Sequence, residues 1–156
     1  MSNRRQHAIA GAAAGAGAAL FQVRPSAPPF ETLLEALGGA GGGFVGSALP
    51  DLIEPATSPN HRDVAHSVAA STALTVKTAR PFSFYREGLR ARADDYAAKR
   101  RQSEVPRLEQ LWYFLCECFY RLVAGAVSGL VPGYLSHLVL DAGTPKGIPL
   151  LAARLI

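Results

Sequence analysis

The sequence predicts an all-α protein, a compact helical bundle formed by a single domain over residues 1–156. Three observations support this fold class. No segment alternates apolar and polar residues as half-buried strands do. Apolar segments rich in alanine and glycine are separated by breaks that contain proline. Charged residues make up 18% of the chain, below the roughly 25% of soluble domains, so we expect the bundle to be associated with a membrane.

The first predicted helix runs from near Asn3 to Leu20, with a polar residue available as its N-cap. Arg4 and Arg5 before an apolar run also resemble the start of a signal peptide, but the run is mostly alanine and glycine, which favours a retained helix. One face of this helix carries very small residues and allows another helix to approach closely. This face holds His7, Gly11, Ala14, Gly15 and Ala18.

The second segment, Glu31–Leu49, is rich in glycine and follows a break with three prolines at Arg24–Phe30. Each glycine costs about 1 kcal/mol relative to alanine in an exposed helix. The segment is therefore either a loop or a helix held by tight packing in protein or lipid. A phosphate-binding loop is disfavoured, because no Gly-Lys-Ser or Gly-Lys-Thr sequence follows the glycines.

The third predicted helix follows an acidic turn that Pro50 and Pro55 bracket. Ser58 and Pro59 have the residue types of an N-cap and a first helical position, so the helix is expected to start there. Its expected end is near Arg80.

A polar, basic insertion is predicted over residues 81–109 and is expected to contain a helix of its own within Tyr85–Glu109. Half of the lysines and arginines of the chain lie between Arg80 and Arg107. The main interpretation is a solvated cytoplasmic face, and contact with nucleic acid or anionic lipid is the alternative. The sequence contains no direct nucleic-acid-binding motif.

The last apolar segment runs from Leu111 to Leu140. Its part from Leu122 onward contains no charged residue and is long enough to span a bilayer. Pro132 interrupts it, so we expect one helix that ends near Val131 and another over Gly133–Asp141.

The two cysteines, Cys116 and Cys118, are two residues apart, so on a helix they point about 200° away from each other. We therefore expect them to be small buried side chains and not to form a disulfide. Reduced thiols fit a cytoplasmic or membrane setting.

His137 and Asp141 are the clearest candidate metal ligands. They are four residues apart and so lie on one face of a helix. The spacing suits two ligands of one metal or of a pair of metals, or else a simple pair on a helix surface. Because this segment is apolar, burying these groups is costly unless they are paired or bound to a metal.

A second group of candidate ligands lies earlier in the chain. His61 and His66 are five residues apart, so they do not share a helix face cleanly, and the acidic turn carries Asp51 and Glu54. The histidines could instead have capping or hydrogen-bonding roles, and the carboxylates could form only a polar turn. Imidazole and carboxylate ligands together suit zinc, manganese or iron. We therefore expect one or two divalent ions, with zinc first, at a site between helices.

The segments LPDLIEPATSPNHRDVAHS and GYLSHLVLDAGTPKGIPLL resemble the two signature segments of the YdjM-like family. Members of this family are described as LexA-binding, inner-membrane-associated, metal-dependent hydrolases. The resemblance covers Asp51–Ser67 and Gly133–Leu150, and His7 lies outside it. It implies a reaction class without a substrate. The metal ligands that it implies are Asp51, His61, His66, His137 and Asp141, with His7 as a further one.

Three further residues receive candidate roles beside this resemblance. Glu54 stands where family members commonly have aspartate, so it is either a ligand or the general base. Lys146, in the TPKG sequence, could hold an anionic substrate or be a solvent-exposed turn residue, and the same alternatives hold for Arg62. A looser similarity to all-α zinc-dependent phospholipases C and nucleases favours a phosphoester, including a lipid head group.

The expected function is a membrane-associated metal-dependent hydrolase, in which a metal-activated water attacks a phosphoester or a related ester. The alternative is a membrane or regulatory interaction protein that binds a LexA-like regulator and carries a structural metal. Six candidate ligands exceed the four of a structural zinc site, which favours the hydrolase. The expected location is the inner membrane, with Arg4–Arg5 and Arg80–Arg107 in the cytoplasm. The alternative is that the protein is soluble and located in the cytoplasm.

Overall fold

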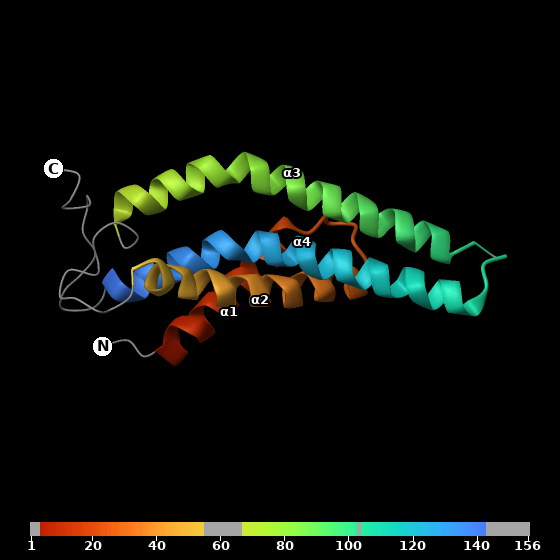
Figure 1. Ribbon diagram of the computed structural model, residues 1–156, viewed down its shortest axis with the longest axis horizontal. Helices are drawn as coiled ribbons and strands as arrows, with labels where there is room; N and C mark the ends of the chain where they lie inside the picture. The colour runs from red at the N-terminus through yellow and green to blue at the C-terminus, as the bar shows by residue number, and fades with distance from the viewer. Residues whose placement is uncertain (1–3, 55–66, 103, 143–156) are drawn as a thin grey trace.

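The computed structural model describes residues 4–54, 67–102 and 104–142, and these residues form four helices and no strand. The helices are α1 (Arg4–Gln22), α2 (Pro29–Ile53), α3 (Val68–Arg100) and α4 (Arg107–Ala142). They form an elongated bundle in which α2 and α4 run side by side, α1 lies obliquely against α2, and α3 packs along α4 (Figure 1). The predicted all-α class and helical bundle are confirmed.

Glycine allows α2 to pack directly against the backbones of both α1 and α4. A Cβ atom on Gly42 would overlap the carbonyl oxygen of Ala126 in α4, and one on Gly43 would overlap that of Gly11 in α1. Such close approach lets dispersion forces and weak Cα–H···O contacts offset the low helix propensity of glycine. Of the two alternatives for the glycine-rich segment, the tightly packed helix is correct. The other glycines at these contacts are Gly15, Gly38, Gly39, Gly46, Gly125, Gly129 and Gly133.

Three prolines, Pro50, Pro81 and Pro132, lie inside the described helices, and the breaks predicted at all three are wrong. The helix α2 continues through Pro50, so Asp51 is helical and does not belong to a turn. The helix α4 continues through Pro132 as a single element. A proline removes one backbone hydrogen bond and usually kinks a helix. Next to both prolines, backbone contacts hold the helices in place, because a Cβ atom on Gly46 or Gly133 would overlap the neighbouring helix.

The helix α3 begins at Val68, and the Ser67 side chain caps it by accepting a hydrogen bond of 3.1 Å from the Ala70 N–H. The predicted start at Ser58 and Pro59 lies outside the described residues. The predicted end near Arg80 is wrong, because α3 continues through Pro81 to Arg100. The basic segment 81–109 thus lies on the second half of α3, the turn after it and the first residues of α4.

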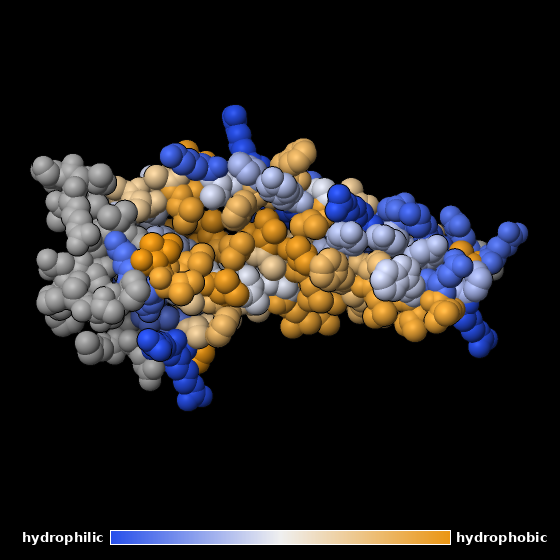
Figure 2. All heavy atoms as spheres, viewed as in Figure 1, coloured by the Kyte–Doolittle hydropathy of each residue, from blue (hydrophilic) through white to orange (hydrophobic). Residues whose placement is uncertain are grey.

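Large apolar side chains are exposed on the outer faces of α2 and α4. In the view of Figure 2, apolar atoms gather over the middle of the bundle, and hydrophilic residues become more frequent toward the α3–α4 turn. Within the part of the chain that the structure describes, α4 is the one helix long and apolar enough to cross a membrane. Only 33% of its most apolar window is buried in the bundle. Cys116 and Cys118 in α4 are free, as predicted, but they are half-buried where buried side chains were expected.

Candidate metal centre

Two histidines and an aspartate converge at one end of the bundle. His7 of α1 and His137 and Asp141 of α4 are buried, and their nitrogen and oxygen atoms all lie within 4.8 Å of one another. The Nε2 atom of His7 is 3.6 Å from Oδ1 of Asp141, and the Nε2 atom of His137 is 3.4 Å from Oδ2 of the same carboxylate. We call His7, His137 and Asp141 the His–Asp cluster.

The small residues of α1 bring His7 to this position. Gly11, one turn after His7, packs against Ser47 and Gly43 of α2, where a Cβ atom would overlap them. This close approach places the His7 ring against that of His137, with centroids 3.9 Å apart and the ring planes at 25°. The spacing of four residues in α4 then places Asp141 beside both rings.

A backbone carbonyl fixes the proton on His137. Its Nδ1 atom lies 2.6 Å from the carbonyl oxygen of Ser47 in α2. A carbonyl oxygen can only accept, so Nδ1 carries the hydrogen and donates it. In the neutral ring, Nε2 therefore presents its lone pair toward the cluster. Metal-binding histidines are commonly oriented in this way by a carbonyl or carboxylate partner.

Asp51 lies at the open edge of the cluster. Its Oδ1 atom is 3.6 Å from Nε2 of His137, and its side chain is 45% exposed. Asp51 follows Ser47 by one turn of α2, so the two residues share the face that meets His137. The structure thus brings four of the six predicted metal ligands to one place.

Glu54 also belongs to this end of the molecule. It is the C-cap residue of α2, and its backbone N–H donates to the carbonyl of Pro50 at 2.9 Å. Its carboxylate acts electrostatically on Tyr134, which precedes His137 by about one turn of α4.

The other predicted site residues, His61, His66 and Lys146, lie outside the described residues, as does Arg62. Their roles stay predictions. The nearest described elements are the end of α2, the start of α3 and the end of α4, and all three lie at the end of the bundle that carries the His–Asp cluster (Figure 1).

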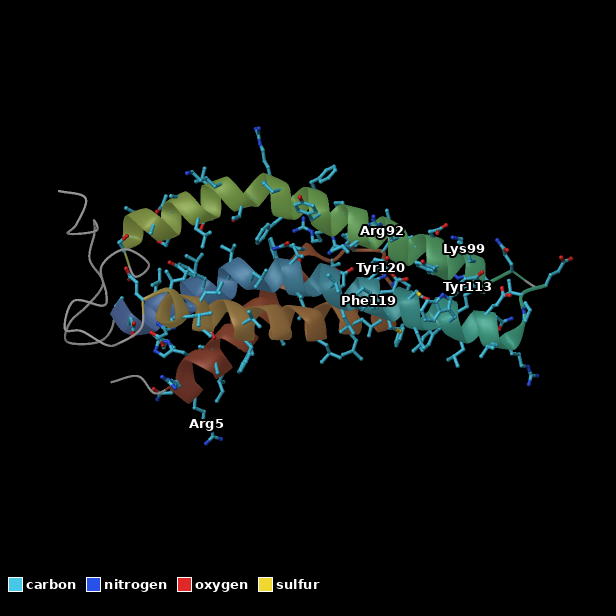
Figure 3. All side chains as sticks on the ribbon, viewed as in Figure 1. Arg5, Arg92, Lys99, Tyr113, Phe119 and Tyr120 are labelled. Atoms are coloured by element: carbon cyan, nitrogen blue, oxygen red, sulfur yellow. The ribbon has the colours of Figure 1, made fainter. Side chains whose placement is uncertain are left out.

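A pocket of about 520 Å³ opens beside the cluster. His7 and Asp51 line it together with two arginines at the start of α1, Arg4 and Arg5. Figure 3 shows Arg5 at this end of α1. The sequence alone indicates only a targeting or topology signal for these arginines. Arg4 precedes His7 by three residues and shares its helix face, and this spacing was the signal for a role at the site.

A second buried polar region, which the sequence did not predict, lies in the middle of the bundle. Arg90 of α3 is buried and donates from Nε to both carboxylate oxygens of Glu35 in α2, at 3.1 Å. Arg121 of α4 is also buried and forms ion pairs with Glu31 and Asp94. We call this region the Arg–Glu network, formed by Glu31, Glu35, Glu87, Arg90, Asp94 and Arg121.

The Arg–Glu network contains both positive and negative side chains, and these charges together with burial shift the pKa values of Glu31 and Glu87. Burial opposes the ionisation of Glu87, but the charges and hydrogen bonds of Arg90 and Arg86 outweigh burial and hold the pKa of Glu87 below its ordinary value. For Glu31, burial is the largest influence and raises the pKa. The sequence signal for the network was the presence of ionisable residues of opposite sign, Glu35 and Arg121, in otherwise apolar helices.

The fold defines a class of all-α helical bundles with a buried cluster of imidazole and carboxylate groups and with one helix, among the described residues, that is long and apolar enough to cross a membrane. Within that class, the chain belongs to the YdjM family: the family model described as "YdjM inner membrane protein" matches residues 1–152. The family resemblance seen in two short segments is thus confirmed over nearly the whole chain. No curated protein and no solved structure matches the chain significantly.

Proposed function

We propose that this protein is a membrane-associated, metal-dependent hydrolase that cleaves phosphoesters. The observation that carries the proposal is the convergence of His7, His137 and Asp141 from two helices, with all ligand atoms within 4.8 Å of one another.

The donor set fits a divalent transition metal. Two imidazole nitrogens and a carboxylate oxygen are ligands that zinc, manganese and iron accept. The hydrogen bond from His137 to the Ser47 carbonyl leaves Nε2 as the ligand atom. Three protein ligands beside an open pocket are typical of catalytic sites, whereas structural zinc sites are closed by four.

A divalent ion at this place would lower the pKa of a water molecule and stabilise the charge that develops on a phosphoryl oxygen. In the hydrolysis, the water oxygen forms a bond to phosphorus, the phosphorus–oxygen ester bond breaks, and the alcohol leaves with a proton. Asp51, beside His137 and half exposed, is a proposed further ligand, and the pocket beside it leaves room for the water. Glu54 is the proposed general base that accepts the proton of the water, and Lys146 the proposed contact to the anionic substrate.

Metal analysis of the purified protein beside two variants tests the proposal. We expect stoichiometric zinc, manganese or iron in the wild type and in Val139→Ala, an exposed position in the same turns of α4. We expect His137→Ala to lose the metal together with activity on bis(4-nitrophenyl) phosphate. A wild-type protein without metal that cannot be reconstituted would overturn the proposal.

The second candidate function is a regulatory interaction protein that binds a LexA-like partner and holds a structural metal. The basic second half of α3, with Arg92 and Lys99 far from Arg5 and the cluster end, supports it, because a charged tip can contact an acidic partner (Figure 3). Under this alternative, His137→Ala would leave partner binding unchanged once folding is verified, and no phosphoesterase activity would accompany the metal.

A further inference from the structure

The pocket beside the His–Asp cluster has a charged part and an apolar part. Arg4, Arg5 and Asp51 contribute the charged part, His7 and Ser47 are polar, and alanine, phenylalanine and leucine side chains contribute the rest. Its volume of about 520 Å³ falls within the roughly 300–1,000 Å³ of typical ligand sites. Such a composition is suited to a ligand with a charged head and an apolar body.

The charged part favours an anion. Arg4 and Arg5 stand in the first turn of α1, where the N–H groups of the helix start also attract negative charge. The planar guanidinium group matches two phosphate oxygens at once, which an ammonium group does not. His7 follows Arg4 by three residues and shares its helix face, so a phosphate held at Arg4 would lie on the side of α1 that carries His7.

The apolar part continues out of the pocket as a stripe along α2. Phe44, Ala48 and Leu52 line the pocket, and because they are spaced by four residues they lie on one face of the helix. Phe44 is 55% exposed and Leu52 is 74% exposed, so the stripe faces the surroundings of the bundle. Leu37, two turns before Phe44, is also exposed and extends the apolar surface further along α2.

We propose that this pocket binds a lipid phosphate ester, with the phosphate on Arg4 and Arg5 and an acyl chain along Phe44, Ala48 and Leu52. The inference rests on the proposed function, because it assigns a substrate class to the same site. A soluble phosphate ester would use the arginines alone, whereas a lipid ester would use both parts of the pocket.

Calorimetric titration of the full chain in maltoside detergent distinguishes these sources of phosphate. The probes are dihexanoyl phosphatidic acid, glycerol 3-phosphate and dihexanoyl phosphatidylcholine. We expect Arg4→Ala/Arg5→Ala to weaken the binding of phosphatidic acid by about 10- to 100-fold. We expect Phe44→Ala/Leu52→Ala to weaken the binding of phosphatidic acid while the binding of glycerol 3-phosphate stays unchanged.

The matched control is Lys77→Ala/Arg80→Ala, which removes two exposed positive charges from α3 and should bind phosphatidic acid as the wild type does. Arg4→Lys/Arg5→Lys should recover part of the loss, since it keeps the charge without the paired geometry. Circular dichroism verifies that each variant is folded.

Two results would overturn the lipid proposal. One is wild-type affinity for phosphatidic acid in Arg4→Ala/Arg5→Ala. The other is equal affinity of the wild type for glycerol 3-phosphate and phosphatidic acid, with no effect of Phe44→Ala/Leu52→Ala. Either result with bound metal would leave the hydrolase proposal intact, whereas absence of metal from the reconstituted wild type would overturn the hydrolase proposal itself.

Discussion

The bundle buries two polar regions of different composition, the His–Asp cluster and the Arg–Glu network. Sixteen residues of α4 separate Arg121 from His137, which is about 24 Å along a helix. In the Arg–Glu network, carboxylates on α2 and α3 meet arginines on α3 and α4, so each carboxylate faces a guanidinium group within the protein. The His–Asp cluster gathers groups that donate electron pairs, beside an open pocket. The network thus has the composition of a structural element, and the cluster that of a ligand site.

The largest expected loss of stability comes from a substitution in the Arg–Glu network. Arg90→Ala would leave the buried carboxylate of Glu35 without its main cation, which costs about 3–5 kcal/mol of unfolding free energy. Arg92→Ala, at an exposed position near the Tyr120 ring, is the control and should cost less than about 1 kcal/mol. Denaturant unfolding of both variants in detergent measures the difference. Equal costs would mean that the network is not a stabilising element.

A smaller effect is expected where glycine separates the two regions along α2. Gly42→Ala should destabilise the protein by about 1–3 kcal/mol, because the new methyl group would overlap the Ala126 carbonyl. Gly41→Ala should stabilise the helix by up to about 1 kcal/mol, because no atom of the described neighbours lies within 4 Å of that Cβ. Thermal unfolding of the two variants measures these changes in stability, which we expect to have opposite signs. A destabilised Gly41→Ala would show that α2 also packs on its outer face.

At the cluster, the expected effect depends on the metal. Zinc at 100 times its dissociation constant should raise the unfolding free energy of the wild type by about 2.7 kcal/mol. His137→Ala should lose this response, whereas Arg90→Ala should keep it despite its lower stability. Unfolding with and without a chelator measures both. The same zinc response in His137→Ala would place the ion elsewhere.

The smallest expected effect is the pH dependence of Glu87. Its folded-state pKa lies below the ordinary value of 4.5, so the stability that it contributes is present above pH 4.5 and is lost as the pH falls through the folded-state pKa. Because the side chain is half exposed, the contribution is at most about 1 kcal/mol. The stability difference between the wild type and Glu87→Gln should therefore shrink in acid. A constant difference would assign the effect of Glu87 to packing.

The sequence could predict the elements of the fold better than their ends. The start of the first helix and the all-α class follow from local patterns, which depend on neighbouring residues alone. The predicted breaks at Pro50 and Pro132 are wrong because contacts with other helices hold these parts of α2 and α4 helical. The sequence does not display such contacts. For the glycine-rich segment, the residue types left two alternatives, a loop and a tightly packed helix. Only the contacts with the partner helices decide between them.

The candidate site shows the same division. The pairing of His137 with Asp141 follows from helix periodicity within one segment. The family resemblance indicated that Asp51 belongs with them, and the small-residue face of α1 indicated His7. The hydrogen bond to Ser47 and the ion pair of Glu35 with Arg90 link residues more than fifty positions apart, and spacing carries no information on such pairs.

The position of Arg5 and Lys99 near opposite ends of the bundle has a consequence for membrane topology (Figure 3). A helix with the 36 residues of α4 is about 54 Å long, whereas a hydrocarbon core is about 30 Å thick. A bundle that crosses the bilayer upright would therefore place its two basic ends in different leaflets, and the expectation that both face the cytoplasm requires the bundle to lie within one interface. In the upright orientation, the His–Asp cluster would meet the lipids of a single leaflet.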